Sequence, residues 1–187
     1  MARVTIFGSS NTSPGDPIYE SARRLGAGLA RSGHIVISGG YIGVMEGVSR
    51  GAAENGGHVI GVTCEAIEAW RPVRANPWVK EEIRCANLPQ RMSVMMNDCQ
   101  IALVMPGGPG TLSEVSLMWD LLLTESIPPK PLILVGEGWK QTFEAFFQAF
   151  ESLIPLSQRK WLIFSPNEEH ALKLINGETI TSEDQVQ

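Results

Sequence analysis

The sequence predicts an α/β protein with a Rossmann-like, doubly wound parallel sheet in a three-layer α/β/α arrangement. Two observations lead to this fold class. Short apolar runs with the length of buried strands alternate with longer segments in which apolar residues recur every three or four positions. Glycine-rich turns follow several of these runs, as expected for repeated strand–turn–helix units. Ligands of such folds bind at the carboxyl ends of the strands, so we expect the functional site at these turns.

Length and charge limit the kinds of protein that this chain can be. Its 187 residues are expected to form a single domain over residues 1–177, followed by a polar, acidic tail over residues 178–187. The 15 Lys and Arg residues and the 20 Asp and Glu residues give a net charge of −5. Because no basic block is present, we expect no nucleic-acid partner and predict a small-molecule ligand.

Cysteine spacing and hydropathy indicate a cytoplasmic protein. Cys64, Cys85 and Cys99 are widely spaced and form no CxxC pair, which predicts buried, reduced thiols rather than disulfides or a zinc site. The first residues enter a strand directly, which leaves no room for a signal peptide. No apolar run approaches the roughly 20 residues of a membrane span, so we expect no membrane partner.

The first part of the chain is expected to form three strands and two helices. Arg3–Phe7 is a short β-branched and aromatic run that ends in a Gly-Ser-Ser turn. A helix over residues 17–32 has one apolar face, and Gly33 lies at the position of its C-terminal cap. A strand over residues 34–37, a second glycine turn (SGGYIG), a helix over 44–55 and a strand over 58–62 follow.

The periodic pattern breaks over residues 63–80, which we expect to form a long loop. Trp70, Arg71 and Trp78 lie there among prolines and further basic residues. A loop of this composition is often a lid or a ligand wall. Residues 80–85 then predict a short strand, and residues 88–98 predict a helix that carries Arg91 and a methionine-rich face.

The most informative stretch covers residues 101–120 and reads IALVMPGGPGTLSEVSLMWD. Residues 101–105 predict a buried strand, Pro106 ends it, and a glycine turn leads into a helix that begins at Thr111. The unpaired N–H groups and the positive end of the helix dipole would then meet at one point, which favours a phosphate. Glu114 lies one turn into this helix, where a carboxylate is useful if it faces a sugar or a water molecule.

The last part of the chain repeats the same alternation. The helix expected over residues 139–153 carries an aromatic stripe that should face the core. The expected strands are 131–135 and 161–164, the expected helices are 139–153 and 167–175, and the stripe consists of Phe143, Phe146, Phe147 and Phe150.

Each candidate residue also has a purely structural interpretation. Glu114 could compensate the helix dipole, an effect of roughly 0.3–1 kcal/mol, and Arg91 alone could be a solvated helix residue. The turn glycines Gly39, Gly40 and Gly43 are candidates for nucleotide binding, but they could also serve the fold alone. Neither glycine turn forms GxGxxG or GxxxxGK[ST] in the expected place, which argues against a hydride-transfer enzyme and an NTPase.

Two motifs resemble those of the LONELY GUY (LOG) family of cytokinin riboside 5′-monophosphate phosphoribohydrolases, formerly labelled lysine decarboxylases. PGGPGTLSE is similar to the family's PGGxGTxxE signature, and SGGYIGVMEG is similar to its GGxxGLMG turn. Arg91 precedes Glu114 at the separation that the resemblance implies for the family's arginine–glutamate pair. The resemblance implies hydrolysis of AMP or a cytokinin riboside 5′-monophosphate to the free base and ribose 5-phosphate.

The resemblance also implies roles for individual residues. The 5′-phosphate would be held by four residues of the second turn: Gly107, Gly108, Gly110 and Thr111. Glu114 would act at the ribose, and Arg91 would orient Glu114 and keep its carboxylate ionised at neutral pH. The resemblance implies a homodimer and calls for no metal and no cofactor. The alternative is a non-catalytic carrier or sensor of a phosphorylated ligand, such as molybdenum cofactor or a nucleotide.

Overall fold

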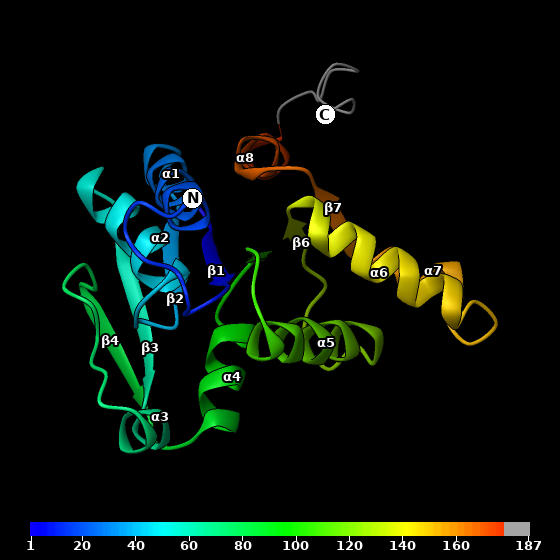
Figure 1. Ribbon diagram of the computed structural model, residues 1–187, viewed down its shortest axis with the longest axis horizontal. Helices are drawn as coiled ribbons and strands as arrows, with labels where there is room; N and C mark the ends of the chain where they lie inside the picture. The colour runs from blue at the N-terminus through cyan, green and yellow to red at the C-terminus, as the bar shows by residue number, and fades with distance from the viewer. Residues whose placement is uncertain (178–187) are drawn as a thin grey trace.

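The central feature of the computed structural model, which describes residues 1–177, is a seven-stranded, all-parallel sheet (Figure 1). The strands are β1 (Arg3–Phe7), β2 (Ile35–Ser38), β3 (Val59–Cys64), β4 (Glu81–Cys85), β5 (Ile101–Val104), β6 (Leu132–Val135) and β7 (Leu162–Ser165). Their order across the sheet is β4-β3-β2-β1-β5-β6-β7. The predicted fold class is therefore confirmed, and the tail expected over residues 178–187 lies outside the described residues.

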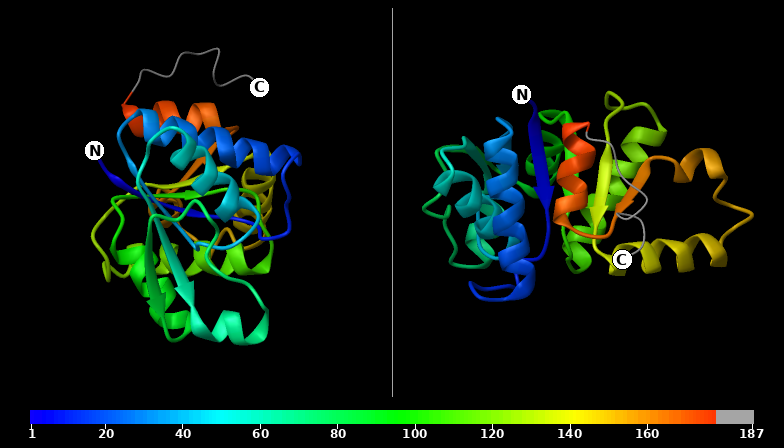
Figure 2. Two further views of the ribbon diagram at one scale, coloured as in Figure 1. Left: turned by 90° about the vertical axis from the view of Figure 1, so that its left-hand side faces the viewer. Right: turned by 90° about the horizontal axis from the view of Figure 1, so that it is seen from above.

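Helices cover both faces of the sheet. The helices are α1 (Pro17–Arg31), α2 (Val44–Glu54), α3 (Glu65–Trp70), α4 (Leu88–Asn97), α5 (Pro109–Leu123), α6 (Glu137–Ala149), α7 (Leu156–Arg159) and α8 (Glu168–Asn176). Side chains of α1, α2 and α8 share one core cluster with alternate strand residues, and those of α4, α5 and α6 share another. Figure 2 shows α1 and α8 side by side over one face. None of the described helices is long and apolar enough to cross a membrane.

Side chains of successive strand residues point to opposite faces of the sheet, so each strand contributes to both core clusters. In β5, Ala102 and Val104 face the α4–α5–α6 cluster, while Leu103 faces the α1–α2–α8 cluster. The strands therefore read as continuous apolar runs, as buried parallel strands do. The chain adds β2, β3 and β4 on one side of β1 and then returns to add β5 on the other side, which places a topological switch point between β1 and β5.

Several expected boundaries were wrong, each for a local reason. Residues 63–80 are not a continuous loop, because α3 lies within them. Since α3 has no buried residue, its sequence shows no apolar periodicity that would have predicted a helix. Helix α5 begins at Pro109 rather than Thr111, since proline fits the first helical position. The short helix α7 lies between the predicted elements and also has no buried residue.

The predicted aromatic stripe of α6 is only half buried. Phe143 and Phe147 are in the core, where both rings pack edge-on against Trp119 of α5. Phe146 and Phe150 are 39% and 47% exposed. Each pair is spaced by four residues and forms a row along the helix, but only the row of Phe143 and Phe147 faces the core. Helix α6 also spans 137–149 rather than the expected 139–153, because Gly136, with φ of 105°, forms its N-terminal cap.

Candidate functional site

A cavity of about 480 Å³ opens beside the switch point, at the carboxyl ends of β1 and β5. Its volume suits a small molecule. Its walls come from the turn after β1, the start of α5, the middle of α4 and the end of α3. The polar side chains among its lining residues are Ser9, Ser10, Asn11, Tyr41, Arg71, Arg91, Thr111, Ser113 and Glu114.

The first turn of α5 forms one wall of this cavity. Gly108 is the N-cap residue, and the N–H of Leu112 donates the first intrahelical hydrogen bond to its carbonyl, at 3.0 Å. The N–H groups of Gly110 and Thr111 come before that bond and have no intrahelical acceptor, whereas Pro109 has no N–H. A Cβ added at Gly108 or Gly110 would meet no atom within 4 Å. The wall therefore presents open backbone donors at a helix N-terminus, a suitable site for an anion.

Gly107 lies beside this wall and does not line the same cavity. It lines a neighbouring hollow together with Gly136 and Trp139. A Cβ at Gly107 would overlap the Thr111 hydroxyl, so the glycine leaves room for a side chain that is 4% exposed. Gly107 thus shapes the turn between β5 and α5 by allowing the Thr111 side chain to pack beneath it.

Arg91 of α4 and Glu114 of α5 meet at the cavity wall. Nη1 of Arg91 lies 4.0 Å from Oε1 of Glu114, and the two side chains are 6% and 16% exposed. Both residues line the cavity. Because Glu114 lies one turn beyond the open N–H groups, an anion bound there would bring its attached group toward the carboxylate.

Arg91 is held by contacts on several sides. Its Nε donates a hydrogen bond of 2.8 Å to the carbonyl of Val62 at the end of β3. Its guanidinium carbon lies 5.8 Å from the centre of the Tyr41 ring, a cation–π distance. A Cβ at Gly39 would overlap Nη2 of Arg91 and would lie 2.5 Å from the sulfur of Met45. Gly39 therefore provides the space that Arg91 occupies.

The Glu114 carboxyl is not held fully ionised, which corrects the expectation from the sequence. Burial raises its pKa to about 7, and the Arg91 guanidinium offsets only part of that rise. At a separation of 4.0 Å the pair lacks the short, charge-assisted hydrogen bond that would favour the carboxylate more strongly. Near neutral pH the group can therefore both accept and release a proton.

Gly40 and Gly43 lie behind the cavity rather than in its lining. Both have positive φ, 77° and 73°, which side chains rarely adopt. A Cβ at Gly43 would overlap the Ser9 carbonyl, and the Val44 N–H donates to that same carbonyl at 2.8 Å. The glycine turn after β2 thus supports the β1 turn and Arg91, and contacts to a nucleotide from Gly39, Gly40 and Gly43 stay a prediction.

Sequence reasoning missed part of this site. Ser9, Ser10 and Asn11 line the cavity, and their position directly after β1 was a signal for it, since parallel strands end at one edge. Trp70 and Arg71, by contrast, were expected on a ligand wall within residues 63–80, and both line the cavity. Across residues 1–177, no group of three or more His, Cys, Asp and Glu side chains could hold a metal ion. All three cysteines are buried and free, as predicted.

Comparisons with known proteins show which family this sequence resembles. The sequence pattern described as the SLOG cluster4 family matches residues 1–152. The chain is 30% identical to cytokinin riboside 5′-monophosphate phosphoribohydrolase LOG5 of Arabidopsis thaliana, over 91% of this chain and 75% of that protein.

Two solved structures share the fold. The molybdenum cofactor binding protein of Rippkaea orientalis has a TM-score of 0.73 at 22% identity, covering 94% of this chain and 95% of that one. The structural genomics target TM1055 has a TM-score of 0.72 at 26% identity, covering 95% and 99%.

Proposed function

The chain belongs to the SLOG cluster4 family, and from this membership and the Arg91–Glu114 pair we propose that it hydrolyses a nucleoside 5′-monophosphate. The bond broken is the N-glycosidic bond, and the products are the free base and ribose 5-phosphate. AMP and N6-substituted AMP of the cytokinin type are the proposed substrates. The phosphoribohydrolase activity for which LOG5 is named, together with the 30% identity to it, supports this choice.

In this proposal, the first turn of α5 binds the phosphate and the next turn, with Glu114, acts on the ribose. The N–H groups of Gly110 and Thr111, with the helix dipole behind them, would bind the 5′-phosphate. This places the ribose one helical turn further along, beside Glu114. As the C1′–N bond breaks, its electron pair leaves with the base and positive charge develops on the ribose ring. An ionised Glu114 stabilises that charge and accepts a proton from the water that adds to C1′. The departing base takes up a proton from solvent, and Glu114 returns to its ionised form by releasing its proton to solvent.

One observation carries the proposal: a carboxyl group with a pKa of about 7 lies in the cavity, one turn from a helix terminus with open backbone N–H groups. A catalytic acid or base works best when its pKa is close to the operating pH. Simple dipole compensation needs no such shift, because an exposed carboxylate would serve equally well. The burial of Glu114 beside Arg91 therefore favours a chemical role over a purely structural one.

The test is release of adenine from AMP and of the free base from isopentenyl-AMP by the purified protein. We expect both bases to appear with an equal amount of ribose 5-phosphate. Glu114→Gln should lower the rate by about 10²–10⁴-fold while AMP still binds, because the phosphate contacts come from backbone groups. Glu144→Gln, on the exposed side of α6, is the matched control and should retain full activity.

Two outcomes would contradict the proposal. Full activity of Glu114→Gln would remove the carboxylate from the mechanism. Binding of AMP without release of base from either substrate would favour the alternative, a carrier or sensor that holds a phosphorylated ligand without cleaving it.

A further inference from the structure

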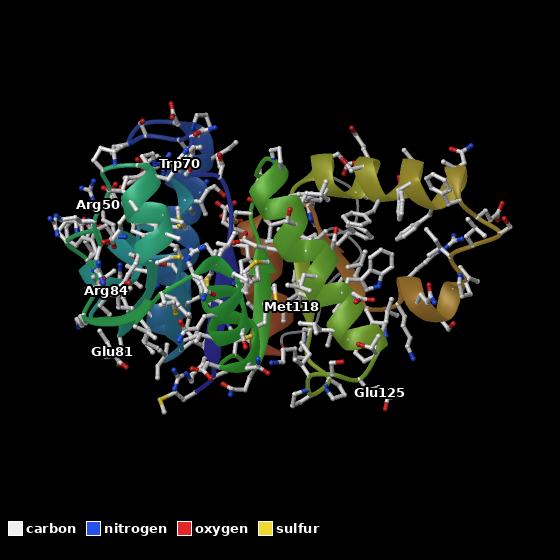
Figure 3. The ribbon with its side chains drawn as sticks, turned by 90° about the horizontal axis from the view of Figure 1, so that it is seen from below. Arg50, Trp70, Glu81, Arg84, Met118 and Glu125 are labelled. Atoms are coloured by element: carbon white, nitrogen blue, oxygen red, sulfur yellow. The ribbon has the colours of Figure 1, made fainter. Side chains whose placement is uncertain are left out.

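Trp70 is an exposed tryptophan at the edge of the cavity. It is the last residue of α3, its side chain is 80% exposed, and it lines the cavity together with Asn11 and Glu114. Figure 3 shows it on the same side of the molecule as the loop after β1. A large aromatic surface left in water beside a polar cavity is typical of a binding surface rather than of a core.

Arg71, the next residue, packs against the Trp70 ring. Its guanidinium carbon lies 5.9 Å from the centre of that ring, so the cation covers one face of it and leaves the other face open. Arg71 also lines the cavity.

Polar contacts rather than apolar packing position α3 together with Arg71, a segment here called the arm. The Tyr41 hydroxyl donates to Oε1 of Glu68 on α3 at 3.3 Å, and Nη2 of Arg84 on β4 donates to Oε2 of the same residue at 2.8 Å. The ring of that same Tyr41 lies under the Arg91 guanidinium. The arm and the Arg91–Glu114 pair are therefore attached to one buried side chain, which sets their relative position.

We infer that Trp70 and Arg71 bind the base of the nucleotide, with the base stacked on the open face of Trp70 and Arg71 holding that ring from its other face. The identity of the ligand as a nucleotide rests on the proposed function. Every nucleobase has a π-face, so the Trp70 ring matches the part of the ligand that the turn before α5 and Glu114 leave uncontacted. Trp70 and Arg71 would then hold the base without selecting among the bases.

Calorimetric titration with AMP and with ribose 5-phosphate, which lacks the base, tests this assignment. All variants carry Glu114→Gln so that AMP is not consumed. We expect Trp70→Ala to weaken AMP binding about tenfold and to leave ribose 5-phosphate binding within about twofold. Trp70→Phe should recover most of the loss. Arg71→Met should also weaken AMP binding selectively, since it keeps the side-chain stem and removes the cation that covers the other face of the Trp70 ring.

Trp78 provides the matched control. It belongs to the same connection, packs against Arg50 at 5.5 Å and does not line the cavity, so Trp78→Ala should leave both affinities unchanged. The inference is overturned if Trp70→Ala weakens both ligands equally or weakens neither. It is equally overturned if AMP binds no more tightly than ribose 5-phosphate.

Failure of this inference is distinguishable from failure of the proposed function. Binding is measured in a variant without the carboxylate, so selective loss of AMP binding supports the arm even if the wild-type protein releases no base. Conversely, base release by the wild type with no effect of Trp70→Ala on AMP binding overturns the arm alone.

Discussion

Glu114 illustrates how burial of a titratable side chain can lower the stability of a fold. Its carboxyl is mostly enclosed, and its pKa is raised to about 7 because burial disfavours the charged form. Arg91 lowers that pKa by its charge, but the separation of 4.0 Å limits the effect. A group with a raised pKa in the folded state binds a proton more strongly there than in the unfolded chain. The folded protein therefore loses stability when pH rises through the interval between the two pKa values.

We expect Glu114→Gln to stabilise the fold at pH 8 more than at pH 5. The interval runs from the unfolded value of 4.5 to about 7, and the full cost of ionising the buried group is at most about 3 kcal/mol. Glutamine removes that cost and keeps the shape of the side chain. Urea-induced unfolding at the two pH values measures it. An equal difference between variant and wild type at both pH values would mean that the pKa of Glu114 is not raised.

At the scale of elements, glycines decide how closely the turns and helices approach, and they do so in two ways. Gly39 directly follows β2, and a Cβ there would overlap Nη2, at the far end of the Arg91 side chain. Gly51 of α2 lies against backbone, where a Cβ would overlap the carbonyl oxygen of Arg23 in α1. A side chain can swing away at little cost, but two packed helices cannot separate without opening the core. The same substitution should therefore have different consequences at the two positions.

Gly39→Ala should lower activity with little effect on stability. The added methyl group displaces the Arg91 guanidinium from Glu114, and we expect base release to fall by at least about tenfold because catalysis is sensitive to small misplacements. The free energy of unfolding should change by less than about 1 kcal/mol. Gly138→Ala is the control, because a Cβ there meets no atom within 4 Å. Wild-type turnover by Gly39→Ala would show that the position of Arg91 does not matter for the reaction.

Gly51→Ala should show the reverse pattern. We expect it to destabilise the protein by about 1–3 kcal/mol, because α1 and α2 must move apart, while the folded fraction keeps its activity. Chemical denaturation compared with the rate per folded molecule separates the two effects. A stability equal to that of the wild type would mean that the two helices tolerate a wider spacing.

At the scale of the whole molecule, α8 joins the end of the described chain to its beginning. Glu168 at the start of α8 accepts hydrogen bonds of 2.6 Å from the Ser21 hydroxyl and from Nε of Arg24, both on α1. Burial alone would raise the pKa of Glu168, but these hydrogen bonds and the Arg24 charge outweigh it and hold the pKa below its usual value. A lowered pKa stabilises the fold at pH values above the unfolded pKa, and this contribution is lost as pH falls through the folded value.

Glu168→Gln should destabilise the protein by about 1–2 kcal/mol at pH 7, because both donors lose their charged acceptor. The difference from wild type should shrink below about pH 4.5, where glutamate in the unfolded chain becomes protonated. Thermal unfolding across this range measures it, with the exposed neighbour Glu169→Gln as the control. A difference that stays constant down to acid pH would assign the loss to shape rather than to charge.

The sequence by itself determined the class of fold, the order of the main elements and the place of the helix terminus proposed to bind an anion. These features follow from local patterns: apolar runs of strand length, helical periodicity, and the proline and glycines between residues 106 and 110. It also identified Arg91 and Glu114 as a pair through resemblance to a family, although nothing local links α4 to α5. Helices without a buried face, such as α3, gave no periodic signal and were missed.

Only the tertiary structure decided how the site works. The separation of Arg91 and Glu114, the pKa of about 7, the space that Gly39 leaves for Arg91 and the position of Trp70 at the cavity all depend on β3 and β5 lying on opposite sides of β2 and β1. Burial and distance arise from residues far apart in the chain that the sheet order brings together. Local sequence specifies which side chains are present, and long-range packing sets their pKa values and the distances between them.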